Sequence, residues 1–291
     1  MTEMINPLQH LPQARTGDDG VWDGRHIVWK VPSSWAGTLS AWLAPRFRRD
    51  GMRRLKPGTY RDLCWDDREW SRVLAQCLVA DLDYHAGKLA EAIARITLRV
   101  YHGCRTDDAG VYSRAGLNIH DRAEMKCKLG AILDAHPKLN YLKARLPEAM
   151  AAMDIGIDEG RLFVVADDQA LIEHAAHYLI YGSEWISSVL GQSRYVLKKV
   201  GTPTLLEIDL PLRIAHPATR REFASTMLRE WTRLACNTPD WSAPIDFTFT
   251  LRENIPPAWI VGHSHPTELA DPLEQFSKYT PTRLDCAHCR E

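Results

Sequence analysis

The spacing of apolar residues changes at Ile96, and this change constrains the fold more than any other feature of the sequence. From Asp66 onward, apolar residues recur three and four positions apart, which is typical of an amphipathic helix. From Ile96 to Tyr101, apolar and polar residues alternate instead, as they do in a half-buried strand. We therefore predict a mainly helical region over residues 1–95 and a second domain over residues 96–291 that ends in a C-terminal tail.

The helical pattern after Asp66 extends to Ala94, and we expect a break near Gly87. Further along the chain, short apolar runs bounded by turn residues alternate with helical patterns. We expect strands over residues 161–166, 204–210, 245–251 and 259–262, and helices after Asp121, after Asp167 and over residues 222–235. The strands lack the regular spacing of βαβ units, so an α+β fold suits the order better than a parallel sheet does.

The composition limits the partners that we expect. The chain of 291 residues is 45% hydrophobic and 25% charged, and its formal net charge is −1. So little net charge argues against binding a nucleic-acid backbone or an anionic membrane through charge alone. Six basic residues between Arg46 and Lys56 are either a solvated face or a local anion-binding surface. No apolar stretch approaches the ~18–20 residues that span a bilayer, so we expect no membrane partner.

The first twenty residues lack the basic and then apolar order of a secretory signal. We therefore expect a cytoplasmic location and reduced thiols at the seven cysteines. The ten tryptophans are expected in the core or in hydrogen-bonded positions. The sequence makes no prediction of the oligomeric state.

The segment Tyr101-His102-Gly103-Cys104-Arg105 is the first candidate for a functional site. We expect the strand to end at Gly103, where the backbone can approach a flat amide ligand and His102 can hydrogen-bond a ribose hydroxyl. The alternative is a strand-end histidine that is satisfied by a neighbouring carbonyl, followed by a turn glycine. A thiol nucleophile at Cys104 is a further alternative.

The motifs after Ile96 resemble those of the ADP-ribosyltransferase superfamily, in the branch shared by poly(ADP-ribose) polymerases and RNA 2′-phosphotransferases. In that branch a first strand ends in His-Gly-Thr, a short loop ends in Gly-Leu, and a later strand runs into a Val-Pro-Pro turn. The corresponding segments are residues 101–104 (YHGC), 116–117 (GL), 161–168 (RLFVVADD), 206–209 (LEID) and 255–257 (IPP). The resemblance implies a split antiparallel sheet in an α+β domain that uses NAD as its substrate.

The resemblance also implies which residues bind NAD. His102 would hydrogen-bond the ribose, and the backbone of Gly103 would face the nicotinamide amide. Arg105 would bind the pyrophosphate, because its planar fork suits phosphate oxygens; the alternative for Arg105 is a surface salt bridge with a neighbouring aspartate. The aromatic ring that stacks on nicotinamide would come from Tyr178 or Tyr181.

Two carboxylates are candidates for the catalytic acid. Asp246 stands near the start of the last strand, where the family places its closing glutamate. Glu184 follows Tyr181 by three residues, so the two side chains would share one helix face and act together. The alternative at this second position is a core tyrosine beside an exposed glutamate. A carboxylate is needed because nicotinamide release passes through an oxocarbenium-like state whose positive charge it stabilises.

These observations predict NAD-dependent transfer of ADP-ribose to a macromolecular acceptor, either protein or nucleic acid. A bacterial toxin or a phage-defence effector is a setting that would suit such an enzyme. One alternative on the same fold is NAD-dependent removal of an RNA 2′-phosphate. Another is a non-enzymatic binding or adaptor protein that keeps the scaffold and has lost its acid.

Cys286 and Cys289 form a CxxC unit near the end of the chain, and His263 and His265 precede it by about twenty residues. Four such ligands would close a structural zinc site. The spacing is not that of a standard zinc finger, so we expect a disordered tail and assign no metal ligand.

Overall fold

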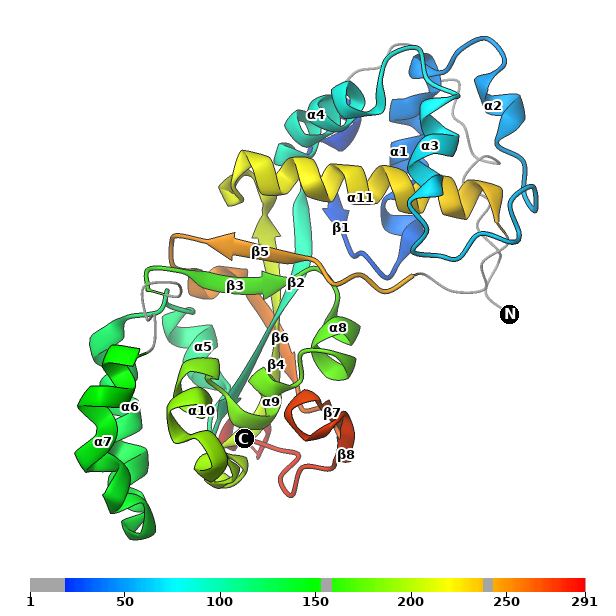
Figure 1. The fold of residues 1–291 in the computed structure, drawn as a ribbon. Helices are drawn as coiled ribbons and strands as arrows, with labels where there is room; N and C mark the ends of the chain where they lie inside the picture. Colours follow the sequence, from blue (N-terminus) through cyan, green and yellow to red (C-terminus); the bar gives the residue numbers. More distant parts are fainter. Residues whose placement is uncertain (1–18, 153–158, 238–242, 291) are drawn as a thin grey trace. The chain divides into compact units, whose positions relative to one another are not determined.

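The computed structural model describes residues 19–152, 159–237 and 243–290, which form two compact units (Figure 1). Unit 1 contains residues 1–99 and 210–247, and unit 2 contains residues 100–209 and 248–291. Unit 1 therefore takes in residues 210–247 in addition to the expected N-terminal region. Helices are combined with a largely antiparallel sheet, as an α+β fold requires. None of the described helices is both long and apolar enough to cross a membrane.

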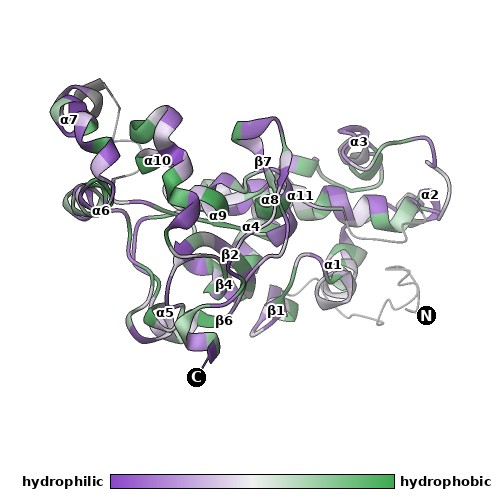
Figure 2. Cartoon of the chain, turned by 90° about the horizontal axis from the view of Figure 1, so that it is seen from below, coloured by the Kyte–Doolittle hydropathy of each residue, from purple (hydrophilic) through white to green (hydrophobic). Residues whose placement is uncertain are grey.

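Unit 1 is built around one long helix, α11 (Pro217–Cys236), which packs against α3 (Glu69–Ala75) and α4 (Leu82–Ala92). Hydrophobic and hydrophilic positions alternate along α11 (Figure 2), and the predicted apolar residues Phe223, Met227 and Trp231 are all buried. The helix predicted over residues 222–235 is therefore confirmed. The unit also contains β1 (His26–Ile27), α1 (Ala36–Leu43), α2 (Gly51–Arg54) and several short 3-10 helices.

Tryptophans fill the core of unit 1. Six of them are fully buried there: Trp22, Trp29, Trp35, Trp42, Trp70 and Trp231. Five of their indole N–H groups are donated inside the unit, for example from Trp231 to Ser40 Oγ at 2.8 Å and from Trp29 to the Ala243 carbonyl at 3.0 Å. The sixth, Trp22 Nε1, is buried without a hydrogen-bond partner among the described residues. All six indoles thus contribute a large apolar area to the core, which confirms the prediction of core positions, and in five of them the one donor is also satisfied.

The predicted helix from Asp66 to Ala94 is wrong in one respect, because the break lies before Asp81 and not near Gly87. Residues 77–79 are held by residues 46–48 through backbone hydrogen bonds, from Arg48 N to Cys77 O and from Val79 N to Arg46 O, both at 2.9 Å. Asp81 then caps α4 by accepting a hydrogen bond from Tyr84 N at 2.6 Å. Tertiary pairing and the new cap together outweigh the continuous helical pattern.

The sheet has the strand order β5-β3-β2-β4-β6. Its strands are β2 (Thr97–Thr106), β3 (Leu162–Val165), β4 (Thr202–Pro211), β5 (Thr248–Leu251) and β6 (Ile260–Ser264). β3 pairs antiparallel with both β2 and β5, and β4 pairs antiparallel with β6. β1 adds a short parallel pairing to the first residues of β2. These strands correspond to the short apolar runs predicted from the sequence.

Strand β2 does not end at Gly103, so that prediction is wrong. The strand continues to Thr106, and a Cβ atom at Gly103 would lie 3.2 Å from Leu179 Cγ and 3.4 Å from Tyr178 Cβ. Helix α9 (His177–Tyr181) thus packs directly on the strand at this glycine. Since side chains alternate along a strand, His102 and Cys104 face the side opposite to Gly103 and Arg105.

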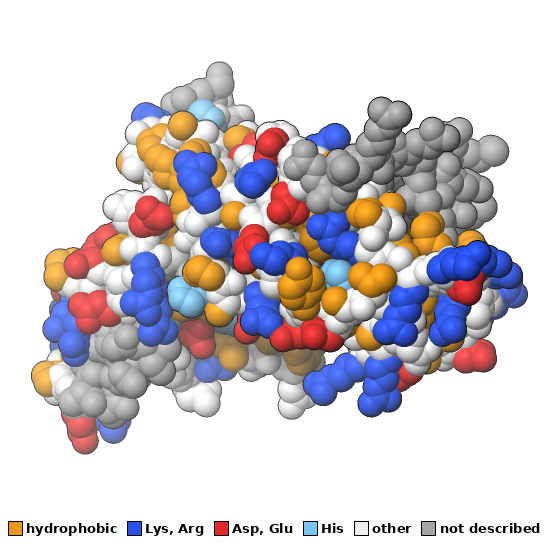
Figure 3. Space-filling model, turned by 90° about the horizontal axis from the view of Figure 1, so that it is seen from above, with side chains coloured by type: hydrophobic (Ala, Val, Ile, Leu, Met, Phe, Trp, Pro, Cys, Tyr) orange, Lys and Arg blue, Asp and Glu red, His pale blue; other side chains and the backbone are white. Residues whose placement is uncertain are grey.

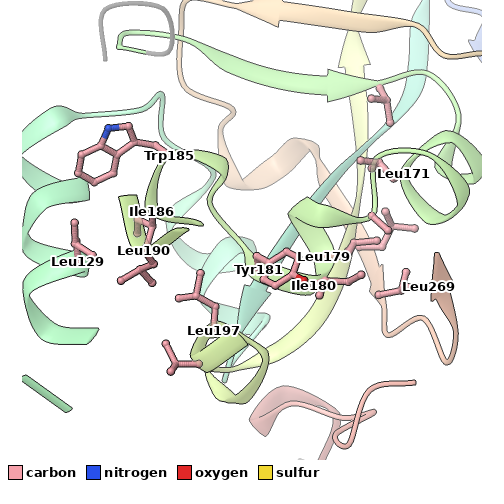
Figure 4. Packing of buried hydrophobic residues seen from close by; sticks show 14 of the residues in the cluster. Leu129, Leu171, Leu179, Ile180, Tyr181, Trp185, Ile186, Leu190, Leu197 and Leu269 are labelled. Carbon is pink, nitrogen blue, oxygen red and sulfur yellow. The ribbon is translucent and has the colours of Figure 1, made fainter. Parts of the chain in front are cut away.

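Unit 2 contains the helices α5 (Gly110–Ala115), α6 (Arg122–Ala135), α7 (Asn140–Ala152), α8 (Asp168–Glu173), α9 and α10 (Glu184–Leu190). All of them except α5 contribute residues to an apolar cluster or pack against it, and part of this cluster is shown in Figure 4. Leu129 from α6, Leu179 from α9 and Trp185 from α10 meet in this cluster. The helices predicted after Asp121 and Asp167 are confirmed, and both aspartates cap them: Asp121 accepts from Glu124 N at 2.8 Å and Asp167 from Gln169 N at 3.0 Å.

The C-terminal segment is folded onto unit 2, so the expected disordered tail is wrong. After the hairpin of β7 (Leu269–Asp271) and β8 (Ser277–Tyr279), the chain ends in a 3-10 helix, η11 (Ala287–Arg290). Ala287 N donates to Asp107 O at 2.8 Å, and Thr202 Oγ1 donates to Asp285 O at 2.8 Å. These bonds attach the segment to the loop after β2 and to the start of β4.

The Gly-Leu segment (residues 116–117) and the Ile-Pro-Pro turn (residues 255–257) are joined by backbone hydrogen bonds. Leu117 N donates to Ile255 O at 2.9 Å, and Ile255 N donates to Leu117 O at 2.8 Å. Gly116 has a φ of +81°, and a Cβ atom there would lie 2.3 Å from Ile255 O. The Gly-Leu segment and the Ile-Pro-Pro turn therefore form one short bridge, and only glycine fits at its first position.

Substitution of Gly116 by alanine is expected to lower the free energy of unfolding by ~2 kcal/mol or more, because the side chain adds both a strained φ and a backbone clash. Gly130→Ala is the matched control, since Gly130 lies inside α6 with no atom within 4 Å of its added Cβ. The control should gain ~0.5–1 kcal/mol from helix propensity. Urea unfolding at 25 °C measures both changes, and equal stability of the two variants would contradict this account of the bridge.

Candidate functional site

His102 lies on β2 and is hydrogen-bonded to the neighbouring strand. Its Nδ1 is 2.9 Å from the Phe163 carbonyl oxygen of β3. A carbonyl can only accept, so Nδ1 carries the proton and Nε2 is the acceptor of the neutral ring. The pKa of His102 is lowered to about 4, mainly by burial and in smaller part by the nearby His120, against the opposing effect of the Phe163 bond. At neutral pH the ring therefore offers one acceptor nitrogen, which suits a hydroxyl donor.

Cys104 shares the face of His102 but is not an activated thiol. Burial raises the pKa of Cys104 to about 12, although a hydrogen bond with Tyr112 of α5 acts in the opposite direction. A nucleophilic cysteine requires a lowered pKa, because the thiolate is the reactive form. The structure therefore favours a core role for Cys104 over a thiol nucleophile.

The Arg105 side chain binds backbone carbonyls of its own unit. Its Nε donates to Val200 O at 2.7 Å, and its Nη1 and Nη2 donate to four more carbonyls at 2.7–3.2 Å. The acceptors of these four bonds are Leu179, Ile180, Lys198 and Gly201. A guanidinium has five N–H groups, so the five carbonyls match its donors one for one. In this conformation the guanidinium donors are used by carbonyls, so Arg105 is placed neither for the predicted pyrophosphate contact nor for the alternative surface salt bridge.

Tyr178 and Glu184 form a hydrogen-bonded pair on the Gly103 side of β2. Tyr178 donates its hydroxyl to Glu184 Oε2 at 2.6 Å, and His177 Nε2 lies 3.8 Å from the same oxygen. The rings of His177 and Tyr178 are 4.1 Å apart. The Glu184 side chain is 56% exposed, so its carboxylate is accessible from solvent. Because alternation along β2 turns His102 to the other side, the structure does not bring Glu184 and His102 together on one face.

The prediction that Tyr181 and Glu184 share one helix face is wrong. Tyr181 is the last residue of α9, Gly182 follows with a φ of +80°, and Glu184 begins α10. Tyr181 is buried in the apolar cluster, where its hydroxyl donates to Asp271 Oδ2 at 2.7 Å. Lys198 Nζ donates to the same oxygen at 3.0 Å. Tyr181 is thus a core residue, in agreement with the alternative reading of this segment.

Sequence reasoning did not single out Asp271 or Lys198. Asp271 is 1% exposed, and it is paired with Lys198 across 73 residues of sequence. Such a buried pair leaves no local signal, because neither residue lies in a recognisable motif. The ion pair and the hydrogen bond from Tyr181 satisfy a carboxylate that would otherwise be costly to bury.

Asp246 is exposed and belongs to unit 1, whereas His102 and Glu184 belong to unit 2. It lies in the irregular segment of residues 243–247, which directly precedes β5. Its catalytic role therefore stays a prediction.

The basic residues between Arg46 and Lys56 are partly engaged within unit 1. The Arg46 guanidinium lies over the Trp42 ring at 3.6 Å, and Arg48 Nε donates to Leu78 O at 2.5 Å. Arg53 is paired with Asp50, and Arg49 and Arg54 line a shallow hollow beside it. On the face drawn in Figure 3, basic and acidic side chains are interspersed.

Two histidines and two cysteines of unit 2 form a cluster with the chemistry of a metal site. His263 and His265 come from β6 and the residue after it, and Cys286 and Cys289 come from the C-terminal segment. One donor atom of each residue lies within 4.8 Å of those of the other three. Among the described residues, this is the group of side chains that could hold a metal ion.

Substitution of Arg105 by lysine is expected to lower the free energy of unfolding by ~3 kcal/mol, since three ammonium donors cannot serve five carbonyls. Arg283→Lys is the matched control, because Arg283 makes one exposed ion pair with Asp107. The control should change stability by less than ~1 kcal/mol. Urea unfolding measures both, and similar losses in the two variants would argue against a structural role for Arg105.

The lowered pKa of His102 predicts an acid-sensitive stability. The unfolded chain binds a proton at a histidine pKa of ~6.5, whereas folded His102 binds one only near pH 4. Protonation of this one histidine in the unfolded chain should therefore lower the free energy of unfolding by about 3 kcal/mol as the pH drops from 6.5 to 4. His102→Asn removes the titrating group and keeps a donor for Phe163. Between pH 6.5 and 4, the free energy of unfolding of this variant should therefore fall by about 3 kcal/mol less than that of the wild type. An identical pH profile in both proteins would contradict the assignment.

Comparison of the chain with models of protein families, with curated proteins and with solved structures finds no match.

Proposed function

We propose that unit 2 binds NAD and transfers its ADP-ribose group to a macromolecular acceptor. The observation that carries this proposal is the state of His102, whose Nδ1–H is used by Phe163 and whose Nε2 accepts at neutral pH. A ribose hydroxyl is a donor of the required kind. The bridge between Leu117 and Ile255 supports the proposal further, because it joins two landmarks of the resemblance.

In the proposed reaction the bond between nicotinamide and the ribose carbon breaks, and its electron pair leaves with nicotinamide. A nucleophile of the acceptor then bonds to the same carbon and loses a proton. His102 would orient the ribose by accepting a hydrogen bond from one hydroxyl. Of the two predicted carboxylates, Glu184 is accessible and bound to Tyr178, but it lies on the opposite side of β2. Which carboxylate would stabilise the transition state is therefore tested separately, with the Glu184 and Asp246 variants described below.

A non-enzymatic binding scaffold is the second candidate function. The observation that favours it is the full use of Arg105 by backbone carbonyls, which removes the predicted contact to pyrophosphate. A protein of this kind would keep the sheet and the Gly-Leu bridge without turning over NAD.

NAD labelled in its adenine half tests the proposal when it is incubated with the full chain, with and without cell protein and RNA. We expect nicotinamide release and label in protein or nucleic acid. His102→Ala should lower the rate at least tenfold, because loss of one hydrogen bond of ~1.4 kcal/mol corresponds to that factor. His174→Ala is the matched control, since His174 is exposed and follows α8 in the same unit.

Two further variants, Glu184→Gln and Asp246→Asn, separate the candidate carboxylates, and the variant that loses activity with unchanged folding identifies the acid. Free ADP-ribose without labelled acceptor would indicate hydrolysis of NAD in place of transfer. Phosphate removal from RNA that carries a 2′-phosphate would favour the alternative reaction. No nicotinamide release from the wild-type chain would overturn the enzyme proposal and favour the scaffold.

A further inference from the structure

The two histidines and two cysteines of the cluster come from segments that are far apart in sequence. His263 lies on β6 opposite Leu206 of β4, and His265 follows the end of β6. Cys286 is buried directly before η11, and Cys289 lies within it. The turn between the cysteines is closed by a hydrogen bond from Cys289 N to Cys286 O at 3.1 Å. The fold thus brings a CxxC turn against two imidazoles at the edge of the sheet.

Distances among the four donor atoms are close to the edges of a metal-centred tetrahedron. With Zn–S bonds of ~2.3 Å and Zn–N bonds of ~2.0–2.1 Å, a tetrahedral site has S···S edges of ~3.8 Å and S···N edges of ~3.6 Å. Cys286 Sγ lies 3.8 Å from Cys289 Sγ and 3.7 Å from His263 Nε2. Cys289 Sγ lies 3.4 Å from His265 Nε2 and 3.1 Å from His263 Nε2. Three of these distances thus lie within ~0.2 Å of the ideal edges and the fourth is ~0.5 Å shorter, and all four donor atoms lie within 4.8 Å of one another.

Neighbouring groups orient the donors toward that point. His265 Nδ1 lies 2.9 Å from the Pro203 carbonyl oxygen, so Nδ1 carries the proton and the lone pair of Nε2 faces the cysteines. A second hydrogen bond of this type is the usual support of a histidine ligand. Ala109 N donates to Cys286 Sγ at 3.4 Å, which stabilises negative charge on this sulfur.

We propose that His263, His265, Cys286 and Cys289 bind one Zn²⁺ ion in a structural site. Two thiolates and two imidazoles in tetrahedral arrangement are the donor set that zinc prefers. Four protein ligands leave no open position for water or substrate, so the ion has no catalytic role. It holds the C-terminal segment against β6, next to the bonds that Ala287 and Thr202 make with their partners. Metal binding would therefore contribute directly to the folding of this end of unit 2.

The first test measures the metal content of the full chain by elemental mass spectrometry. The protein is purified without a histidine tag. We expect about one zinc per chain in the wild type and close to none in Cys289→Ser and His265→Gln. Cys127→Ser is the matched control, because Cys127 is an exposed cysteine on α6 of the same unit and lies outside the cluster. It should keep its full zinc content.

A second measurement does not depend on whether the variants fold. The wild-type chain is stripped of metal with a chelator and titrated with Co²⁺, which reports its own coordination through visible absorption. Intense bands of tetrahedral cobalt with a thiolate charge-transfer band, saturating at one equivalent, would support the site, and zinc should then displace the cobalt. Absence of these bands from the folded chain, or zinc retained by Cys289→Ser, would overturn it. Recovery of a metal-free Cys286–Cys289 disulfide under reducing purification would also overturn it, in favour of a redox pair.

Discussion

The five carbonyls that converge on Arg105 are the constraint on which the arrangement of unit 2 depends. Leu179 and Ile180 lie near the end of α9, where carbonyls have no partner inside the helix, and the guanidinium supplies that partner. The same group also binds Lys198, Val200 and Gly201 at the end of the 3-10 helix η7 (Gly191–Lys199) and just before β4. One side chain on β2 thus fixes the end of α9 and the entry to β4. Gly103, two residues earlier, permits the close approach of α9 that this requires.

Local patterns predicted those parts of the fold whose stabilising contacts are themselves local. Asp121 and Asp167 cap the helices that their positions predict, and the apolar face of α11 is buried as its spacing indicates. Most of the wrong predictions have a different cause, which is a contact between segments distant in sequence; the exception is the pair of Tyr181 and Glu184, which a local turn at Gly182 separates. Residues 77–79 end a helix because they bond to residues 46–48, and β2 passes Gly103 because α9 covers it. The candidate site follows the same rule. His102 was found from its motif, whereas Asp271 and the folding of the C-terminal cysteines depend on distant partners.

Two histidines of unit 2 have the same hydrogen-bonded tautomer but different surroundings. Both His102 and His265 donate Nδ1–H to a backbone carbonyl at 2.9 Å, and each keeps Nε2 as an acceptor with a fixed direction. What lies opposite Nε2 then decides the role. Cys289 Sγ lies 3.4 Å from that atom in His265, which suits the proposed zinc ion, whereas a hydroxyl donor would suit that atom in His102. His85 of unit 1 shows the contrast, because both of its ring nitrogens are buried without a hydrogen-bond partner among the described residues.

The alternation of β2 sharpens what an NAD site in this unit requires. The resemblance treats residues 102, 103 and 105 as one ligand-binding segment, but a strand that continues through them divides their side chains between two faces. The Gly103 face is filled by α9 and the carbonyl network of Arg105. A ligand that bonds to His102 Nε2 therefore has to bind from the other face, where Cys104 and Tyr112 lie. In the proposed reaction the catalytic carboxylate would have to reach that face as well, whereas the pair of Tyr178 and Glu184 lies on the Gly103 side of the strand.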